Sequence, residues 1–126
     1  MINEFVPYDI ALAMKELGFN QRCFHCFDNE DHSKMHKSKR GYKGQYDYVL
    51  APLYQQAFRW FREEYKLFSE VNLTTKQENV ESFEFFVLNV NEPLFESDDY
   101  TVYEEAELAC LKKLIEIVNQ NKDECN

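Results

Sequence analysis

One segment, TVYEEAELACLKKLIEIVN from Thr101 to Asn119, carries the clearest secondary-structure signal in the chain. Thr101 followed three residues later by Glu104 forms a capping box, a pair that satisfies the free backbone N–H groups at the start of a helix. Apolar residues then recur every three or four positions, as one face of a helix requires. The segment therefore predicts a helix that opens at Thr101 and ends near Asn119.

The apolar surface of this helix is wider than contact with one sheet face needs. It consists of two neighbouring lines, Ala106, Cys110, Leu114 and Ile117 beside Leu108, Leu111, Ile115 and Val118. The extra width hints at a second contact through Leu108, Leu111 and Ile115, against a protein partner or a second copy in a homodimer. The width alone favours a helix that the chain's own core covers completely.

The residues before this helix alternate between strand and helix signals. Leu67 to Thr74 and Val80 to Val90 predict two strands joined by a polar turn, which is the pattern of a hairpin. Gln45 to Ala51 alternates apolar and polar residues with a strand period of two. Pro52 then suits the first turn of a second helix, and an aromatic face follows it as far as Tyr65.

The N-terminal part adds one helix and one short strand. Apolar positions after Pro7 follow helical spacing up to Leu17, and Gly18 stands where a left-handed helix cap belongs. Arg22 to Phe27 reads as a brief strand. The resulting order, helix, strand, strand, helix, strand, strand, helix, predicts an α+β fold in which a small antiparallel sheet packs against about three helices.

Length and composition favour one domain. The chain has 126 residues, of which 44% are hydrophobic and 16% aromatic, and one domain usually takes about 100–200 residues. We therefore expect a single domain over 1–126. Within it we expect a mobile basic loop at about 28–44, where periodicity is lost, and a ragged tail at about 120–126.

The excess of negative charge lies entirely in the second part of the chain. The net charge is -9, yet the basic and acidic residues up to Leu50 balance, so the whole excess follows Leu50. A negative field repels phosphate backbones, which excludes general binding to duplex nucleic acid.

The sequence also indicates a cytoplasmic protein. The N-terminal residues lack the basic and apolar regions of a secretory signal, and the longest uncharged stretch, Tyr48 to Phe58, is too short to cross a membrane. The cysteines are then expected as reduced thiols. They are Cys23, Cys26, Cys110 and Cys125.

A cluster of cysteine and histidine offers one metal-binding alternative. Its spacing is C-x2-C-x5-H-x3-H, with the ligand set Cys23, Cys26, His32 and His36. Tetrahedral zinc accepts two thiolates and two imidazoles. The gap between the pairs is shorter than in zinc fingers, and residues three apart on a strand point to opposite faces. We therefore expect no metal or other cofactor, with a structural zinc module as the alternative.

A basic segment offers a second binding alternative. Its candidate ligand-binding residues are Lys37, Lys39, Arg40, Tyr42 and Lys43. Lysine and arginine with nearby glycines could hold the phosphate of a small anionic ligand such as a nucleotide, and the tyrosine could stack on its base. The simpler interpretation is a solvated loop, since no phosphate-binding glycine motif accompanies it.

The sequence gives little support for catalysis. It contains no HExxH or GxSxG motif, and no arrangement of serine, histidine and aspartate is legible. The acidic residues between Glu96 and Glu107 fit a polar turn and a helix N-terminus, where negative charge is favourable. We therefore lean towards a protein that is not an enzyme and name no catalytic residue.

Three stretches together resemble a known family. They are Val6 to Ala13 with Leu17-Gly18-Phe19, Ala51 to Glu63, and Tyr103 to Val118. The resemblance is to small uncharacterised proteins encoded by tailed phages and by Bacteroidetes genomes as prophages. It covers the three predicted helices and about half the chain, and it brings no known activity. It implies a bacterial host cell, and it favours a non-catalytic binding or accessory protein that acts on a protein partner.

Overall fold

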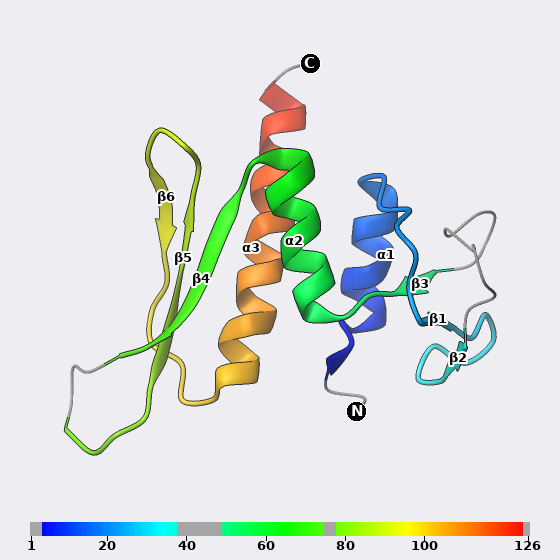
Figure 1. Cartoon of the computed structure of the whole chain (residues 1–126), viewed down its shortest axis with the longest axis horizontal. Helices are drawn as coiled ribbons and strands as arrows, with labels where there is room; N and C mark the ends of the chain where they lie inside the picture. The colour runs from blue at the N-terminus through cyan, green and yellow to red at the C-terminus, as the bar shows by residue number, and fades with distance from the viewer. Residues whose placement is uncertain (1–3, 38–48, 75–77, 125–126) are drawn as a thin grey trace. The chain divides into compact units, whose positions relative to one another are not determined.

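The computed structural model describes residues 4–37, 49–74 and 78–124. Three helices are present in that part of the chain: α1 (Tyr8–Glu16), α2 (Tyr54–Tyr65) and α3 (Tyr103–Glu124). Six strands accompany them: β1 (His25–Phe27), β2 (Met35–Lys37), β3 (Leu50–Ala51), β4 (Phe68–Leu73), β5 (Phe83–Leu88) and β6 (Pro93–Glu96) (Figure 1). The predicted α+β class is confirmed, and the order of elements agrees approximately.

The chain divides into two compact units, Met1–Ala57 and Phe58–Asn126. In the first unit, α1 packs against β3, and the sheet has the strand order β2-β1-β3 with antiparallel pairing. Val6, Ile10, Met14 and Leu50 supply buried apolar side chains to this unit. A backbone hydrogen bond from Val6 N–H to the Pro52 carbonyl (3.0 Å) ties the two ends of the unit together.

Helix α1 ends at the glycine that the sequence predicts. Gly18 has φ +105°, a conformation that side chains disfavour. Its N–H donates to the Lys15 carbonyl (3.0 Å), and the N–H of Phe19 donates to the Met14 carbonyl (2.9 Å). These two bonds form a Schellman motif, and the side chains of Phe19 and Met14 are both buried beside it.

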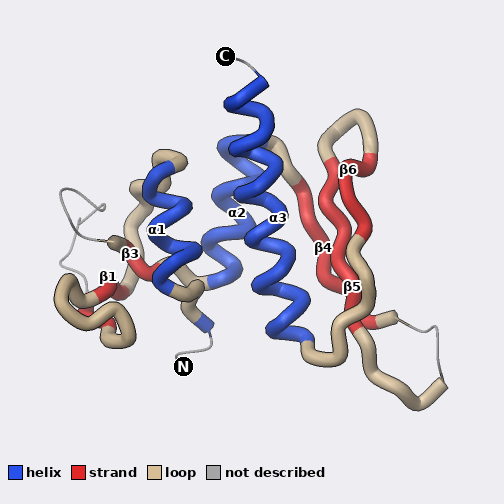
Figure 2. Tube along the Cα trace, turned by 180° about the vertical axis from the view of Figure 1, so that it is seen from behind, coloured by secondary structure: helices blue, strands red, loops and turns tan. Residues whose placement is uncertain are grey.

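The second unit combines α3 with an antiparallel sheet in the order β4-β5-β6 (Figure 2). One sheet face contacts α3: the Ser69 hydroxyl hydrogen-bonds the Cys110 thiol, and Lys113 Nζ lies 4.2 Å from the centre of the Phe95 ring. Phe85 and Val87 of β5 are buried on this face. The sheet and α3 therefore bury one another's apolar side chains.

The structure corrects several details of the predicted fold. It has two three-stranded sheets rather than one. Strand β2 lies inside the predicted loop at 28–44, and β6 lies where no strand is predicted. Both are edge strands with mostly exposed side chains, so neither has the apolar alternation of a buried strand. Residues 38–44 of the predicted loop lie outside the described part.

Helix α3 differs from its prediction at both ends. It begins at Tyr103, two residues after the predicted cap, and continues to Glu124, so the described part of the predicted tail at 120–126 is helical. The residues after Asn119 are polar, so no apolar periodicity indicates that the helix continues to Glu124. None of the helices in the described ranges is long and apolar enough to cross a membrane.

Candidate functional site

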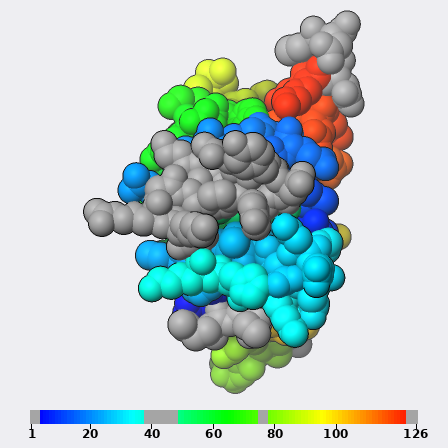
Figure 3. All heavy atoms as spheres, turned by 90° about the vertical axis from the view of Figure 1, so that its right-hand side faces the viewer, coloured from blue at the N-terminus to red at the C-terminus, as the bar shows by residue number. Residues whose placement is uncertain are grey.

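The hairpin of β1 and β2 holds a cluster of polar contacts around Asp28. The strands pair antiparallel, with Cys26 opposite His36 and Phe27 opposite Met35. The backbone N–H of Asp28 donates to the Lys34 carbonyl (2.9 Å), which closes the connecting loop. This segment, cyan in Figure 3, lies on the molecular surface. The hairpin therefore presents its polar side chains to solvent.

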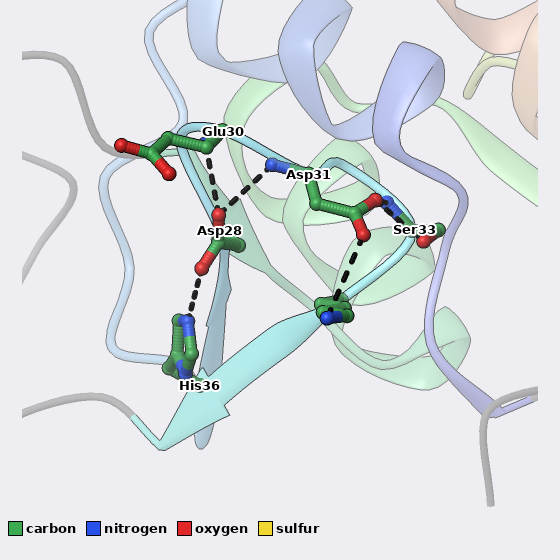
Figure 4. Close-up of polar contacts among 6 residues, drawn as sticks. Asp28, Glu30, Asp31, Ser33 and His36 are labelled. Carbon is green, nitrogen blue, oxygen red and sulfur yellow. Dashed lines mark hydrogen bonds and ion pairs between the residues drawn. The ribbon is translucent and has the colours of Figure 1, made fainter.

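Asp28 organises the loop through its first carboxylate oxygen. Oδ1 accepts hydrogen bonds from the backbone N–H groups of Glu30 (2.8 Å) and Asp31 (2.9 Å) (Figure 4). Asp31 repeats the pattern, because its Oδ1 accepts from the N–H (3.0 Å) and the hydroxyl (2.6 Å) of Ser33. Aspartate commonly forms such turns with the backbone two residues ahead. Two successive turns of this kind give the loop its shape.

The second oxygen of the same carboxylate binds the imidazole of His36. Asp28 Oδ2 contacts Nε2 of His36, which joins the loop to β2. This hydrogen bond is the main reason that the pKa of Asp28 falls to about 2, and the backbone N–H donors lower it further. Asp28 therefore carries its negative charge throughout the physiological range, and it fixes the orientation of the imidazole.

The Asp28–His36 pair alone does not form a catalytic centre. Cys26 is the register partner of His36, and cysteine, histidine and aspartate together are used in nucleophilic catalysis. That chemistry needs a hydrogen bond from the thiol to the imidazole, and none joins these two residues within the structure as described. The His36 side chain is 62% exposed. The pair supports the hairpin and presents a polar surface.

The zinc ligand set is not brought together. The Cys23 thiol donates to the Gln21 carbonyl (3.5 Å), and burial raises its pKa to about 12. His32 stacks on Tyr8 with ring centres 3.7 Å apart, and His36 is engaged by Asp28. Residues 4–37, 49–74 and 78–124 contain no group of three potential metal ligands. The four residues therefore do not share one site here, and a structural zinc module stays an untested alternative.

The predicted ligand-binding segment is only partly described. Lys37 ends β2 and is exposed. The other predicted residues, Lys39, Arg40, Tyr42 and Lys43, lie outside the described residues. Capture of a phosphorylated nucleotide by this segment stays a prediction.

The predicted interface on α3 lies largely inside the chain. Leu111 is 0% exposed and Ile115 is 8% exposed, while Leu108 is half-buried. The wide apolar surface is therefore mostly core, because the helix buries more than the face that meets its sheet. Association through these residues stays a prediction. Cys110 is part of the same core, and burial raises the pKa of its thiol to about 12.

A further surface, which the sequence pattern does not predict, lies on the sheet of the second unit. Glu70 of β4, Phe86 of β5 and Glu96 of β6 are neighbours in register. Side chains alternate along a strand, and Ser69 and Phe95 face α3, so these three residues point to the opposite face. We call this the outer face. Within the second unit, α3 lies on the other side of the sheet (Figures 1 and 2).

The outer face is acidic around an aromatic centre. Glu70 and Glu96 are exposed, whereas Phe86 between them is half-buried. At the end of the same sheet, Val90 is 78% exposed and Leu94 is also exposed. The strand alternation of 83–88 could have indicated Phe86, but the register that places the two glutamates beside it depends on pairing between strands.

Comparisons with known proteins found no relative. No family model, curated protein or solved structure matches the chain.

Proposed function

We propose that the chain is a non-catalytic binding protein that uses the outer face to hold a protein partner. The observation that carries the proposal is the row across three strands in which the exposed Glu70 and Glu96 flank the half-buried Phe86. An aromatic ring supplies contact area at low entropic cost, and the flanking carboxylates select a partner with basic side chains. The proposed setting is the cytoplasm of a bacterial host, as the resemblance to phage and prophage proteins implies.

The distribution of charge supports the outer face as the binding surface. The residues from 58 to 126 contain seven basic and sixteen acidic side chains, so the unit that carries the outer face holds all of the net charge of -9. A field of this sign accelerates encounter with a basic partner. The apolar side chains of Val90 and Leu94 extend the contact area at the sheet end.

A charge-reversal experiment tests the proposal. Glu70→Lys with Glu96→Lys should abolish the recovery of a specific partner in affinity capture from bacterial lysate, measured by quantitative mass spectrometry. The matched control is Glu63→Lys with Glu64→Lys, which changes the net charge equally at exposed positions of α2. A partner must be lost with the first pair and kept with the second. If every captured protein behaves alike with both variants, the outer face is not the binding surface.

A further inference from the structure

Strand β4 is an unprotected edge of its sheet. It spans six residues, contains no proline or lysine, and pairs only with β5 among the described elements. Edge strands expose a row of backbone N–H and C=O groups that can pair with another strand, and natural proteins usually block them with proline, lysine or a bulge. β4 contains neither proline nor lysine, and its register with β5 has no shift, so its outer edge lacks these three devices.

The hydrogen-bond pattern identifies the groups that point outward. Thr74 N–H donates to the Ser82 carbonyl (2.8 Å) at the end of the β4–β5 pairing. Bonding alternates along an antiparallel strand, so Glu70 and Asn72 also bond β5, while Ser69, Val71 and Leu73 direct their backbone groups away.

Strand β5 obeys the same alternation. Phe85 N–H donates to the Ser97 hydroxyl (2.8 Å), and the Phe85 carbonyl accepts from the Ser97 N–H (3.0 Å). The odd-numbered residues of β5 therefore bond on the β6 side, and its even-numbered residues bond β4.

We propose that a second copy of this chain pairs with the open edge, β4 against β4, antiparallel and centred on Val71. In this register Val71 lies opposite Val71 of the second copy, and Ser69 lies opposite Leu73. In this two-fold symmetric register, each of the three outward-facing residues of β4 lies opposite an outward-facing residue of the second copy. The inference rests on the sheet edge and does not depend on the proposed function.

The side chains fit the same register. Glu70 would face Asn72 of the second copy, which can donate hydrogen bonds to a carboxylate. Moving the centre to Glu70 would place two carboxylates directly opposite each other, which is unfavourable. Leu73, now 61% exposed, would gain a neighbouring strand. Because the two-fold axis is perpendicular to the sheet, both outer faces would lie on the same side of a continuous sheet.

Charge sets the conditions under which pairing occurs. Each copy carries a net charge of -9, so the copies repel one another at low salt. Salt shortens the screening length to about 10 Å at 0.1 M, so the dimer should strengthen as salt is raised. The short edge also implies a weak dimer, because small interfaces are typical of transient complexes.

Sedimentation equilibrium of the full chain tests the assembly. We expect a concentration-dependent mass that rises from the 15.2 kDa monomer towards twice that value, more readily at higher salt. Leu73→Pro removes an outward N–H that β5 does not use and should weaken dimerisation at least about tenfold. Leu73→Ser keeps the N–H and should retain the dimer. A monomer under all conditions, or a dimer that survives Leu73→Pro, overturns the proposal.

Cysteine crosslinking tests the register independently and does not rely on the folding of the proline variant. Val71→Cys should form an intermolecular disulfide under mild oxidation, because directly opposed residues have Cα atoms about 5.5 Å apart and a disulfide accepts that distance. Asn72→Cys is the matched control, since it is more exposed but lies diagonally from its own copy. The register is contradicted if Asn72→Cys crosslinks as fast as Val71→Cys or faster. It is also contradicted if Val71→Cys crosslinks no more than the wild type.

Discussion

Asp28 performs two tasks with one carboxylate, and substitutions can separate them. Asn in place of Asp keeps an oxygen that can accept from the N–H groups of Glu30 and Asp31 but removes the negative charge beside His36. Ala removes both. We therefore expect amide hydrogen exchange in the loop to be slowest in the wild type, faster in Asp28→Asn and fastest in Asp28→Ala. Equal rates in the two variants would show that the charge, rather than the turn, shapes the loop.

The depressed pKa of Asp28 predicts a loss of hairpin order in acid. The pKa is about 2 in the folded chain, because His36 and the backbone donors favour the charged form, against about 3.9 for an unperturbed aspartate. The stabilisation is therefore complete above about pH 4–5 and is lost as the pH falls through the folded value near 2. NMR signals of the Glu30 and Asp31 amides should follow this titration in the wild type. Asp28→Asn should lack it.

Gly18 supports the end of α1 through its backbone conformation. Its φ of +105° strains any residue with a Cβ, although no atom lies within 4 Å of the position that a Cβ would take. Gly18→Ala should therefore lower the free energy of unfolding by about 1–2 kcal/mol through backbone strain alone. Urea unfolding followed by circular dichroism measures the change. Glu16→Ala, at an exposed position of the same helix, is the control and should have little effect.

At the scale of the elements, α3 is predicted to serve folding rather than association. Leu111→Ala removes a side chain that is 0% exposed and should cost about 2–5 kcal/mol of unfolding free energy. Leu108→Ala removes a half-buried side chain of the same size and should cost less. Chemical unfolding measures both values. A Leu111→Ala variant that keeps its stability but changes its state of association would restore the interface predicted from the sequence.

Elements that bury an apolar face could be predicted from the sequence, and those that bury little could not. Periodic apolar residues mark both the helix after Pro7 and the strand at 83–88, each of which buries one face. β2 and β6 are edge strands that owe their existence to pairing with β1 and β5, so their own residues give no comparable signal. The end of α1 could be predicted at Gly18 because a positive φ selects glycine. The start of α3 could not be placed as accurately from Thr101, because a threonine cap is one of several ways to begin a helix.

The candidate surfaces were harder to predict because each depends on partners distant in the sequence. The link from Asp28 to His36 requires the hairpin register, which neither residue type reveals. The outer face combines one residue from each of three strands. The apolar width of α3 indicates a surface that must be buried, and Leu111 and Ile115 are buried. The width alone does not distinguish burial by the chain's own core from burial by a partner.

For the whole molecule, the division of charge coincides with the division into units. Residues 51–57 carry no charge, so the balanced segment before them lies in the first unit and the entire excess of acidic residues lies in the second. Two ligands of opposite charge should therefore behave differently. Oligolysine should bind and shift amide NMR signals of the second unit, whereas duplex DNA should bind neither unit at low salt.

The salt dependence of oligolysine binding and a pair of charge-reversal variants test where the oligolysine binds. Binding of oligolysine should weaken as salt is raised, because exposed charges are screened. Glu70→Lys with Glu96→Lys should reduce it more than Glu63→Lys with Glu64→Lys, which alters net charge equally but leaves the outer face intact. Equal losses would mean that the oligolysine responds to net charge alone. A greater loss with the first pair would locate the attraction at the carboxylates that flank Phe86, where a basic protein partner would dock.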